Sequence, residues 1–298
     1  MPASVRVGRS CYNSSRMPIR LIAVDLDGTL LNNNSEISPA NRQALAEASE
    51  RGIRIVIITG RRYHSARPKL ESLPCPVTLV SSNGAVVRSL GGELLHHNFL
   101  PQRIAVQVLE AALDFRPYAV VIFDQPSRGQ VMMQQNASPD GPLRWYQQTA
   151  REYLMQVMDL SAALPEDPIQ IMFGGAPAFL EPLEHLLRAS DAGRHVHLTW
   201  TKYFERDISL LDVMNRGCSK ASGLKWLLEQ MDCEASEVMA IGDNYNDLEM
   251  LQLAGCPVVM GNCCPGLADD GWHITQSNDE DGVAAAIHSL ALNGRRGM

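Results

Sequence analysis

Branched apolar residues form three continuous runs in the first third of the chain, at 21–24, 53–60 and 77–84. Runs without a polar face are typical of strands that are buried on both sides of a parallel sheet. Between these runs the apolar and capping residues predict helices over 39–52 and 62–72. This alternation of strands and helices predicts an α/β fold with a doubly wound, Rossmann-like parallel sheet.

The same alternation returns after Gly217. Strands are predicted at 237–243, 256–260 and 272–275, and helices at 219–231, 246–254 and 280–291. We therefore expect residues 18–87 and 214–298 to form one sheet core that an insertion interrupts.

The middle of the chain, 88–213, is predicted to be an inserted α+β domain because hairpin and helix patterns mix there. A hairpin is expected about the Gly91-Gly92 pair. Loops are expected at 136–143 and 161–168, where proline and polar residues cluster. The other predicted strands are 118–124, 130–135, 168–174, 195–201 and 207–213, and the predicted helices are 102–114, 144–157 and 177–190.

Composition excludes several classes of partner. Lys and Arg total 26 against 33 for Asp and Glu, so the formal net charge is −7. A net-acidic chain is a poor match for nucleic acid or for an anionic membrane, so neither is expected as a partner. No apolar run approaches the roughly twenty residues that a membrane-spanning helix needs.

The cysteines favour a reducing compartment. There are seven, an odd number, and none has C-x-x-C spacing, which argues against a disulfide framework or a zinc site. The eight histidines show no H-x-x-x-H spacing either. We expect a cytoplasmic protein that starts at Met17, with the leader 1–17 disordered or the product of a misassigned start.

Polar residues follow four predicted strands at the point where each strand ends. The first strand ends in DLDGT at 25–29, the second in TGR at 59–61, the third in SNG at 82–84, and a later one in GDNYND at 242–247. Asp-Gly taken alone is a common turn signal. Ligands of open α/β sheets gather at the carboxyl ends of the strands, so four such ends together indicate a binding site.

Carboxylates would crowd one pocket if these strand ends meet. The four are Asp25, Asp27, Asp243 and Asp247. Like charges repel each other in such a pocket, so a hard cation such as Mg²⁺ is expected to hold them. Hydrogen-bond donors near the same strand ends are Thr59, Asn83 and Lys220. Carboxylates, a metal ion and donors together are typical of a phosphoryl-transfer site.

With these motifs the chain resembles the haloacid dehalogenase superfamily of phosphohydrolases, and within it the Cof-type branch. The matching motifs are DLDGT at 25–29, TGR at 59–61, NGA at 83–85, CSKASGL at 218–224, GDNYNDLEML at 242–251, MGN at 260–262 and SNDEDGVAAAI at 277–287. They cover the two outer blocks. The insert matches the family in pattern more than in residues, so the resemblance implies no particular substrate.

The resemblance implies a two-step hydrolysis. Asp25 would attack the substrate phosphorus to form an aspartyl-phosphate, and Asp27 would act as general acid and then as general base. Thr59 and Lys220 would hold phosphoryl oxygens, and Lys220 would also neutralise Asp25. The insert would be a cap domain that closes over the site and reads the leaving group.

The resemblance also implies a ligand set for Mg²⁺ and a wider substrate site. The metal would be held by the Asp25 carboxylate, the Asp27 carbonyl oxygen and Asp243, with Asp247 and Asn246 as further ligands or behind them. Besides Thr59 and Lys220, the substrate-binding candidates are Gly60, Asn83, Gly84 and Asn246.

Several of these residues also have a purely structural interpretation. Asp25 and Asp27 are turn formers, Thr59 can cap a helix, Asn83 can shape a turn, and Lys220 can be a solvated lysine in the first turn of a helix.

Four basic residues close to these motifs are not expected to bind ligand. Arg61, with Arg62 beside it, is predicted to be a surface group. His96 and His97 are predicted to be sheet-edge residues of the insert.

We therefore expect a Mg²⁺-dependent phosphatase, a monomer or weak homodimer, acting on small phosphomonoesters such as sugar phosphates or phosphorylated cofactors. Two alternatives stay open. One is a phosphomutase or phosphotransferase that uses the same aspartyl-phosphate, and the other is a non-enzymatic phospho-acceptor or metabolite sensor. The linkers near 86–88 and 214–217 are expected to be the hinges of the cap.

Overall fold

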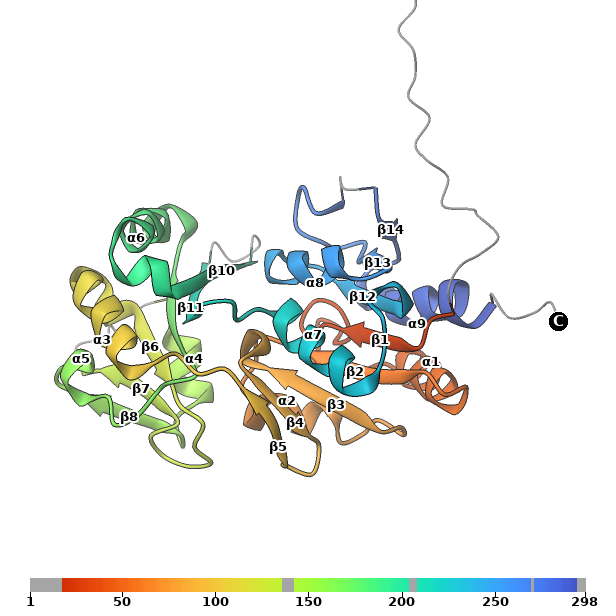
Figure 1. Cartoon of the computed structure of the whole chain (residues 1–298), viewed down its shortest axis with the longest axis horizontal. Coiled ribbons are helices and arrows are strands. Elements are labelled where there is room, and N and C mark those ends of the chain that lie inside the picture. The colour runs from red at the N-terminus through yellow and green to blue at the C-terminus, as the bar shows by residue number, and fades with distance from the viewer. Residues whose placement is uncertain (1–17, 136–141, 204–207, 269–270, 294–298) are drawn as a thin grey trace, which may run out of the picture.

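Two β-sheets organise the chain, and each has its own set of helices (Figure 1). The computed structural model describes residues 18–135, 142–203, 208–268 and 271–293. The predicted leader, 1–17, and most of the predicted loop 136–143 lie outside the described residues.

The larger sheet combines strands from both outer blocks of the chain. Its order is β14-β13-β12-β1-β2-β3-β4-β5. The strands from β14 to β3 run parallel, and β4 and β5 are antiparallel to their neighbours. Its strands are β1 (Leu21–Val24), β2 (Arg54–Ile58), β3 (Val77–Ser81), β4 (Val86–Ser89), β5 (Leu94–His97), β12 (Val238–Gly242), β13 (Cys256–Val259) and β14 (His273–Ile274).

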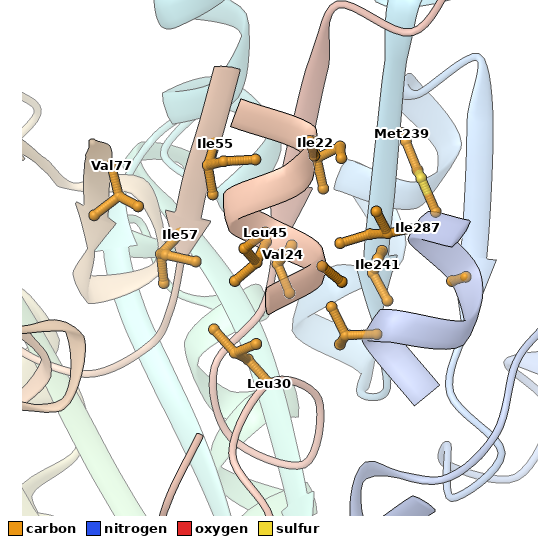
Figure 2. Close-up of a cluster of buried hydrophobic side chains, with 14 of the residues drawn as sticks. Ile22, Val24, Leu30, Leu45, Ile55, Ile57, Val77, Met239, Ile241 and Ile287 are labelled. Carbon is orange, nitrogen blue, oxygen red and sulfur yellow. The ribbon is translucent and has the colours of Figure 1, made fainter. Parts of the chain in front are cut away.

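One face of this sheet packs against helices from opposite ends of the chain. Figure 2 shows Ile22 and Val24 of β1 together with Ile241 of β12, and Leu45 and Ile287 belong to the same buried cluster. Leu45 lies on α1 (Pro39–Glu50), and Ile287 begins the π-helix Ile287–Leu292 that continues α9 (Gly282–Ala286). Helix α2 (Tyr63–Leu70) joins the same cluster.

The other face is formed by the alternate residues of the same strands. Leu21 and Ala23 of β1 pack with Leu224 of α7 (Lys220–Met231) and Leu251 of α8 (Leu248–Leu253). Successive side chains of a strand point to opposite faces. Both faces are covered, and this is why the first apolar run contains no polar position.

The insert forms a second sheet of six strands in the order β10-β11-β9-β6-β7-β8. These are β6 (Ala119–Ile122), β7 (Val131–Gln134), β8 (Leu154–Val157), β9 (Gln170–Gly175), β10 (Val196–Tyr203) and β11 (Ile208–Asn215). The helices are α3 (Gln102–Ala111), α4 (Arg144–Thr149), α5 (Leu160–Ala163) and α6 (Pro177–Ala189).

The two faces of this second sheet, the cap sheet, have different partners. Helices α3, α5 and α6 cover one face, where Phe123 and Phe173 are buried. The opposite face, with Ile122, packs in a cluster that includes Ala85 and Cys218 of the core. This face of the cap sheet therefore packs partly against residues at α4 and partly against the core.

The hairpin of β4 and β5 corrects the predicted start of the cap. β4 pairs with β3, so residues 88–97 belong to the larger sheet and not to the insert. Only the short 3₁₀ turn Ser82–Gly84 and Ala85 separate β3 from β4, which is too little chain to leave the sheet. His96 and His97 do lie on an edge strand, β5, but it is an edge of the core.

The predicted hinge at 86–88 is wrong for the same reason, since these residues lie within β4. The chain crosses to the cap later. Asn98 still donates its backbone N–H to Ala85 of the core, whereas Leu100 donates to Pro168 of the cap. Where the chain returns, the Asn215 side chain donates to the Asn98 side chain at 2.7 Å, so the two crossings lie side by side.

The prediction of a helix over 144–157 is wrong in its second half. Helix α4 ends at Thr149, and Leu154–Val157 forms β8, which pairs with β7. β8 is a short edge strand whose residues are mostly half-buried, so its apolar pattern over four residues does not differ from that of a helix end. The predicted loop 161–168 begins inside α5.

Gly84 is a site where the fold requires glycine. Its φ is +99°, and a Cβ there would clash with the backbone oxygen of Ser219. Gly217 has a φ of +74°, but no atom lies within 4 Å of the place that its Cβ would take.

We expect Gly217→Ala to cost about 1–2 kcal/mol of unfolding free energy through backbone strain alone, and Gly84→Ala to cost clearly more. Urea unfolding of both variants measures the difference, and equal costs would contradict the close packing at Gly84.

Candidate active site

The carboxyl ends of β1 and β12 lie next to each other at the centre of the larger sheet. From β1 the sheet continues through β2 and β3 in one direction, and from β12 through β13 and β14 in the other. Asp25 directly follows β1, and Asp243 directly follows β12. Open α/β sheets bind their ligands at such a reversal of strand order.

Three carboxylates meet at this point. Oxygens of Asp25, Asp243 and Asp247 lie within 4.8 Å of one another, and all three residues are buried. Burial raises the pKa of Asp25 to about 7, although the attraction of Lys220 opposes the shift. Burial also raises the pKa of Asp243 well above its ordinary value, and the charges of Asp25 and Asp247 add to the shift. The cluster therefore carries more negative charge than its surroundings stabilise.

Lys220 is the cation that neutralises part of this charge. Its side chain is 1% exposed, and Nζ lies 2.6 Å from Asp25 Oδ1 and 2.6 Å from Asp247 Oδ1. Burial by itself lowers the pKa of Lys220, but the two carboxylates outweigh it and raise the pKa above its ordinary value. The alternative of a solvated lysine in the first helical turn is wrong, because this first residue of α7 is buried and ion-paired.

Asp247 has a second function in the same cluster. Its Oδ2 accepts the backbone N–H groups of Asp243 and Asn244, each at 3.0 Å. Its other oxygen accepts from Lys220. The carboxylate therefore holds the turn that follows β12, in addition to lying among the predicted metal ligands.

Asp243 is held from the other side by the first motif. Thr29 Oγ1 donates to Asp243 Oδ1 at 2.8 Å. Gly28 has a φ of +77°, and a Cβ at this position would collide with the Asp243 carboxylate. A glycine after Asp27 thus allows the two strand ends to come together.

Arg61 is bound to Asp27, which corrects the prediction of a surface group. Its Nε lies 2.7 Å from Asp27 Oδ2 and its Nη2 2.6 Å from Oδ1, the paired geometry of a guanidinium on a carboxylate. The two side chains are 28% and 37% exposed. Both belong to strand-end loops, so the second carboxylate of the DLD motif is oriented by the arginine of the TGR motif.

Thr59 lies beside this pair and is 1% exposed. Its Oγ1 accepts the backbone N–H of Arg61 at 3.1 Å, which leaves its own O–H to donate. The backbone oxygen of Thr59 accepts the N–H of Asn83 at 3.0 Å. The ends of β2 and β3 are thus joined directly.

The remaining predicted substrate-binding residues mostly contact the protein itself. Asn83 donates through Nδ2 to Asp212 of the cap at 3.0 Å and accepts from Asn246 Nδ2 at 3.0 Å. Gly60 packs beside the Asn83 amide, and Gly84 packs against α7. Asn246 Oδ1 is buried without a hydrogen-bond partner among the described residues.

Arg62 of the core contacts cap residues that the sequence did not mark as functional. Arg62, predicted on the surface, is buried and donates to Gln130. Its guanidinium lies 5.1 Å from the ring centre of Tyr153 and 5.7 Å from that of Tyr146. A sequence signal existed for one more missed residue, Asp212, because a charged residue interrupts an otherwise apolar strand.

A second contact joins cap and core near Asp243. The backbone N–H of Lys202 donates to Asn244 Oδ1 at 3.1 Å, and Asn244 Nδ2 donates to the backbone oxygen of Lys202 at 3.0 Å. Burial raises the pKa of the neighbouring Tyr203 above its ordinary value, and the charges of Asp27 and Asp25 add to the shift. The cap is therefore in direct contact with the turn that follows β12.

Comparison with known proteins shows the family of the chain. The sequence profile of the haloacid dehalogenase-like hydrolases matches residues 22–287. Phosphatase YwpJ of Bacillus subtilis (strain 168) is 30% identical over 91% of this chain and 100% of its own. HMP-PP phosphatase of Serratia proteamaculans (strain 568) is 32% identical over 83% of this chain and 86% of its own.

The fold is also similar to that of a solved structure. The crystal structure of a haloacid dehalogenase-like hydrolase from Bacteroides thetaiotaomicron has a TM-score of 0.73 and 28% identity, covering 91% of this chain and 99% of its own. The chain therefore belongs to the haloacid dehalogenase-like hydrolases and is a hydrolase of their phosphatase type. The predicted family and the α/β fold class are confirmed. No helix in the described residues is both long and apolar enough to cross a membrane.

The ion pairs of Lys220 predict a large stability effect. Lys220→Met would leave the carboxylates of Asp25 and Asp247 buried without their cation, and we expect a loss of about 3–5 kcal/mol in unfolding free energy. Lys225→Met on the same helix is the matched control, because Lys225 is exposed. Urea unfolding measures the unfolding free energy of both variants. A Lys220→Met variant as stable as Lys225→Met would contradict the buried ion pairs.

Proposed function

We propose that the protein is a Mg²⁺-dependent phosphatase that hydrolyses small phosphomonoesters through an aspartyl-phosphate. The observation that carries this proposal is the buried cluster of Asp25, Asp243 and Asp247, in which Asp25 and Asp247 are paired with one lysine, Lys220. The family membership and the phosphatase names of the relatives support phosphate esters as substrates. Sugar phosphates and phosphorylated cofactors are the classes that we expect.

The donor set fits Mg²⁺. Three carboxylates offer oxygen ligands within 4.8 Å of one another, and burial together with mutual repulsion raises the pKa of Asp243. Mg²⁺ prefers such oxygen ligands and commonly shares them with substrate phosphate. Asp25 and Asp243 would hold the ion, with the Asp27 carbonyl oxygen and Asp247 as further ligands. When bound, the ion supplies positive charge next to the phosphoryl oxygens.

The first chemical step is a displacement at phosphorus. A carboxylate oxygen of Asp25 forms the new bond to phosphorus while the bond from phosphorus to the leaving oxygen breaks. Asp27, protonated, gives its proton to the leaving oxygen. Lys220 and the Thr59 hydroxyl donate to phosphoryl oxygens, and Lys220 also holds the nucleophile in place.

The second step returns Asp25 to its carboxylate form. Asp27 takes a proton from a water molecule, and the water oxygen attacks phosphorus as the bond between phosphorus and the Asp25 oxygen breaks. Inorganic phosphate leaves. Arg61 holds both oxygens of the Asp27 carboxylate, which is the base form. When Asp27 carries the proton, the guanidinium keeps hold of the other oxygen only, and it orients Asp27 in both forms.

The two alternatives predict different products. A phosphomutase or phosphotransferase passes the phosphoryl group from Asp25 to another alcohol, so an added acceptor sugar becomes phosphorylated. A phospho-acceptor or sensor keeps the phosphoryl group on Asp25 and releases phosphate slowly. The half-buried pair of Asp27 and Arg61 favours turnover, because a sensor has no need to protonate a leaving group.

The remaining parts of the proposal concern the setting of the enzyme. We propose that it acts in the cytoplasm, as a monomer or weak homodimer, on a small phosphorylated metabolite. The net charge of −7 supports a partner that is neither nucleic acid nor an anionic membrane.

Activity tests the proposal directly. We expect release of inorganic phosphate from p-nitrophenyl phosphate and from a metabolite panel in Mg²⁺, and loss of this activity in EDTA. Asp25→Asn removes the nucleophile, so kcat should fall about a thousandfold or more. Asp114→Asn, which changes an exposed acid of the cap, is the control. Undiminished turnover by Asp25→Asn would disprove the mechanism.

The pairing of Arg61 with Asp27 gives a second kinetic prediction. Arg61→Ala should lower kcat about 10- to 100-fold because the general acid loses its orientation. Arg61→Lys should recover only part of this, since an ammonium cannot hold both carboxylate oxygens in the planar geometry. Arg67→Ala on the exposed side of α2 is the control. If Arg61→Ala and Arg67→Ala turn over equally fast, Arg61 does not position Asp27.

A further inference from the structure

One buried carboxylate of the cap lies outside the catalytic cluster. Asp212 of β11 is 3% exposed and lies on the sheet face that is turned towards the core. Gln170 Nε2 donates to its Oδ1 at 2.7 Å, and Asn83 Nδ2 donates to its Oδ2 at 3.0 Å. Burying an ionised carboxylate costs folding free energy unless hydrogen bonds to the carboxylate compensate for the lost water. Asn83, which supplies one of them, belongs to the core.

Asn83 connects this carboxylate to two catalytic loops. Its side-chain oxygen accepts from Asn246 Nδ2 at 3.0 Å, and Asn246 precedes Asp247. Its backbone N–H donates to the backbone oxygen of Thr59 at 3.0 Å. A hydrogen-bonded chain therefore runs from the cap, through one asparagine, to the loops that carry Thr59 and Asp247.

The direction of the Asn83 amide depends on the cap. An ionised Asp212 accepts hydrogen bonds and cannot donate them. Nδ2 of Asn83 must therefore face the cap, and its Oδ1 must face Asn246. Asn83 also has a φ of +52°, a left-handed conformation that is strained for a residue with a side chain and persists only when its surroundings hold it. Without the acceptor on the cap, this residue would lose the contact that fixes its orientation.

We propose that Asp212 is a positioning residue through which the closed cap orders the turns at 82–85 and 243–247 around the catalytic carboxylates. It acts through Asn83 and touches none of the reacting atoms. The consequence for turnover rests on the proposed phosphatase function, whereas the ordering of the two turns does not.

The chemistry of Asp212 suits this role near neutral pH. Burial raises its pKa to about 7, against the hydrogen bond from Asn83 and the attraction of Lys220. The other titratable groups that face it are Tyr146 and Tyr203 of the cap. Both the ionised and the neutral carboxyl offer Asn83 an oxygen acceptor, and an amide at position 212 offers the same.

Variants of the full-length protein at Asp212 and Asn83 test the proposal. Asp212→Leu removes the acceptor within an apolar sheet face, and Asp212→Asn keeps a side-chain oxygen. Ser209→Ala is the matched control, because Ser209 is buried on the same strand and faces the other side of the sheet. The readouts are hydrogen exchange of the backbone amides at 82–85 and 243–247, and kcat and KM with p-nitrophenyl phosphate.

We expect Asp212→Leu to speed exchange in both turns and to lower kcat about 10- to 100-fold with little change in KM, as for misplaced catalytic groups. Asp212→Asn should keep most of the slow exchange and most of the wild-type kcat. Asn83→Ala should lower kcat as much as Asp212→Leu does, and a variant that combines Asp212→Leu with Asn83→Ala should lower kcat little further.

Exchange in the two turns that is the same in Asp212→Leu and wild type would overturn the proposal. So would an equal effect of Ser209→Ala, which would indicate general weakening of the strand. If Asp212→Leu does not fold, the comparison of Asp212→Asn with Asn83→Ala decides between the outcomes. A wild-type protein without phosphatase activity would refute the proposed function, and the exchange data would still decide the role of Asp212.

Discussion

The attraction between the Lys220 ammonium and two carboxylates holds the centre of this enzyme together. Nζ lies 2.6 Å from Asp25 and 2.6 Å from Asp247, and all three side chains are almost fully excluded from solvent. The three residues come from the end of β1, the start of α7 and the turn after β12. Charges of one sign could not be buried here alone, so the strand ends can meet only because the lysine arrives with them.

The same interaction suits the site to the phosphoryl transfer that we propose. Lys220 neutralises part of the cluster and leaves a surplus of negative charge, which the raised pKa of Asp243 reflects. A divalent cation would remove that surplus and bring positive charge to an arriving phosphate. Asp27 stands apart, bound by Arg61, so two neighbouring aspartates have different partners and can take different roles.

Three of the polar contacts between cap and core lie close to this centre. Arg62 lies against two tyrosines of the cap, Lys202 exchanges hydrogen bonds with Asn244, and Asp212 accepts from Asn83. Each core partner lies within a few residues of a catalytic strand end. Cap and loops are thus in direct contact, and under the proposed mechanism a cap that reads the leaving group would also influence the reaction at phosphorus.

The sequence by itself determined the sheet of the core, the family and the set of strand-end motifs. It could do so because fully buried strands have an unmistakable apolar pattern, and because Asp25, Lys220 and Asp243 stand in local motifs. It missed β8, a short strand with a weak pattern. It predicted the hairpin of β4 and β5 but assigned it to the insert, because only pairing with β3 decides which sheet the hairpin joins. Only the tertiary structure decided the partners of Arg61, Arg62 and Asp212. A side chain's partners across 34 to 129 positions of sequence depend on how whole elements pack, and no local pattern encodes that distance.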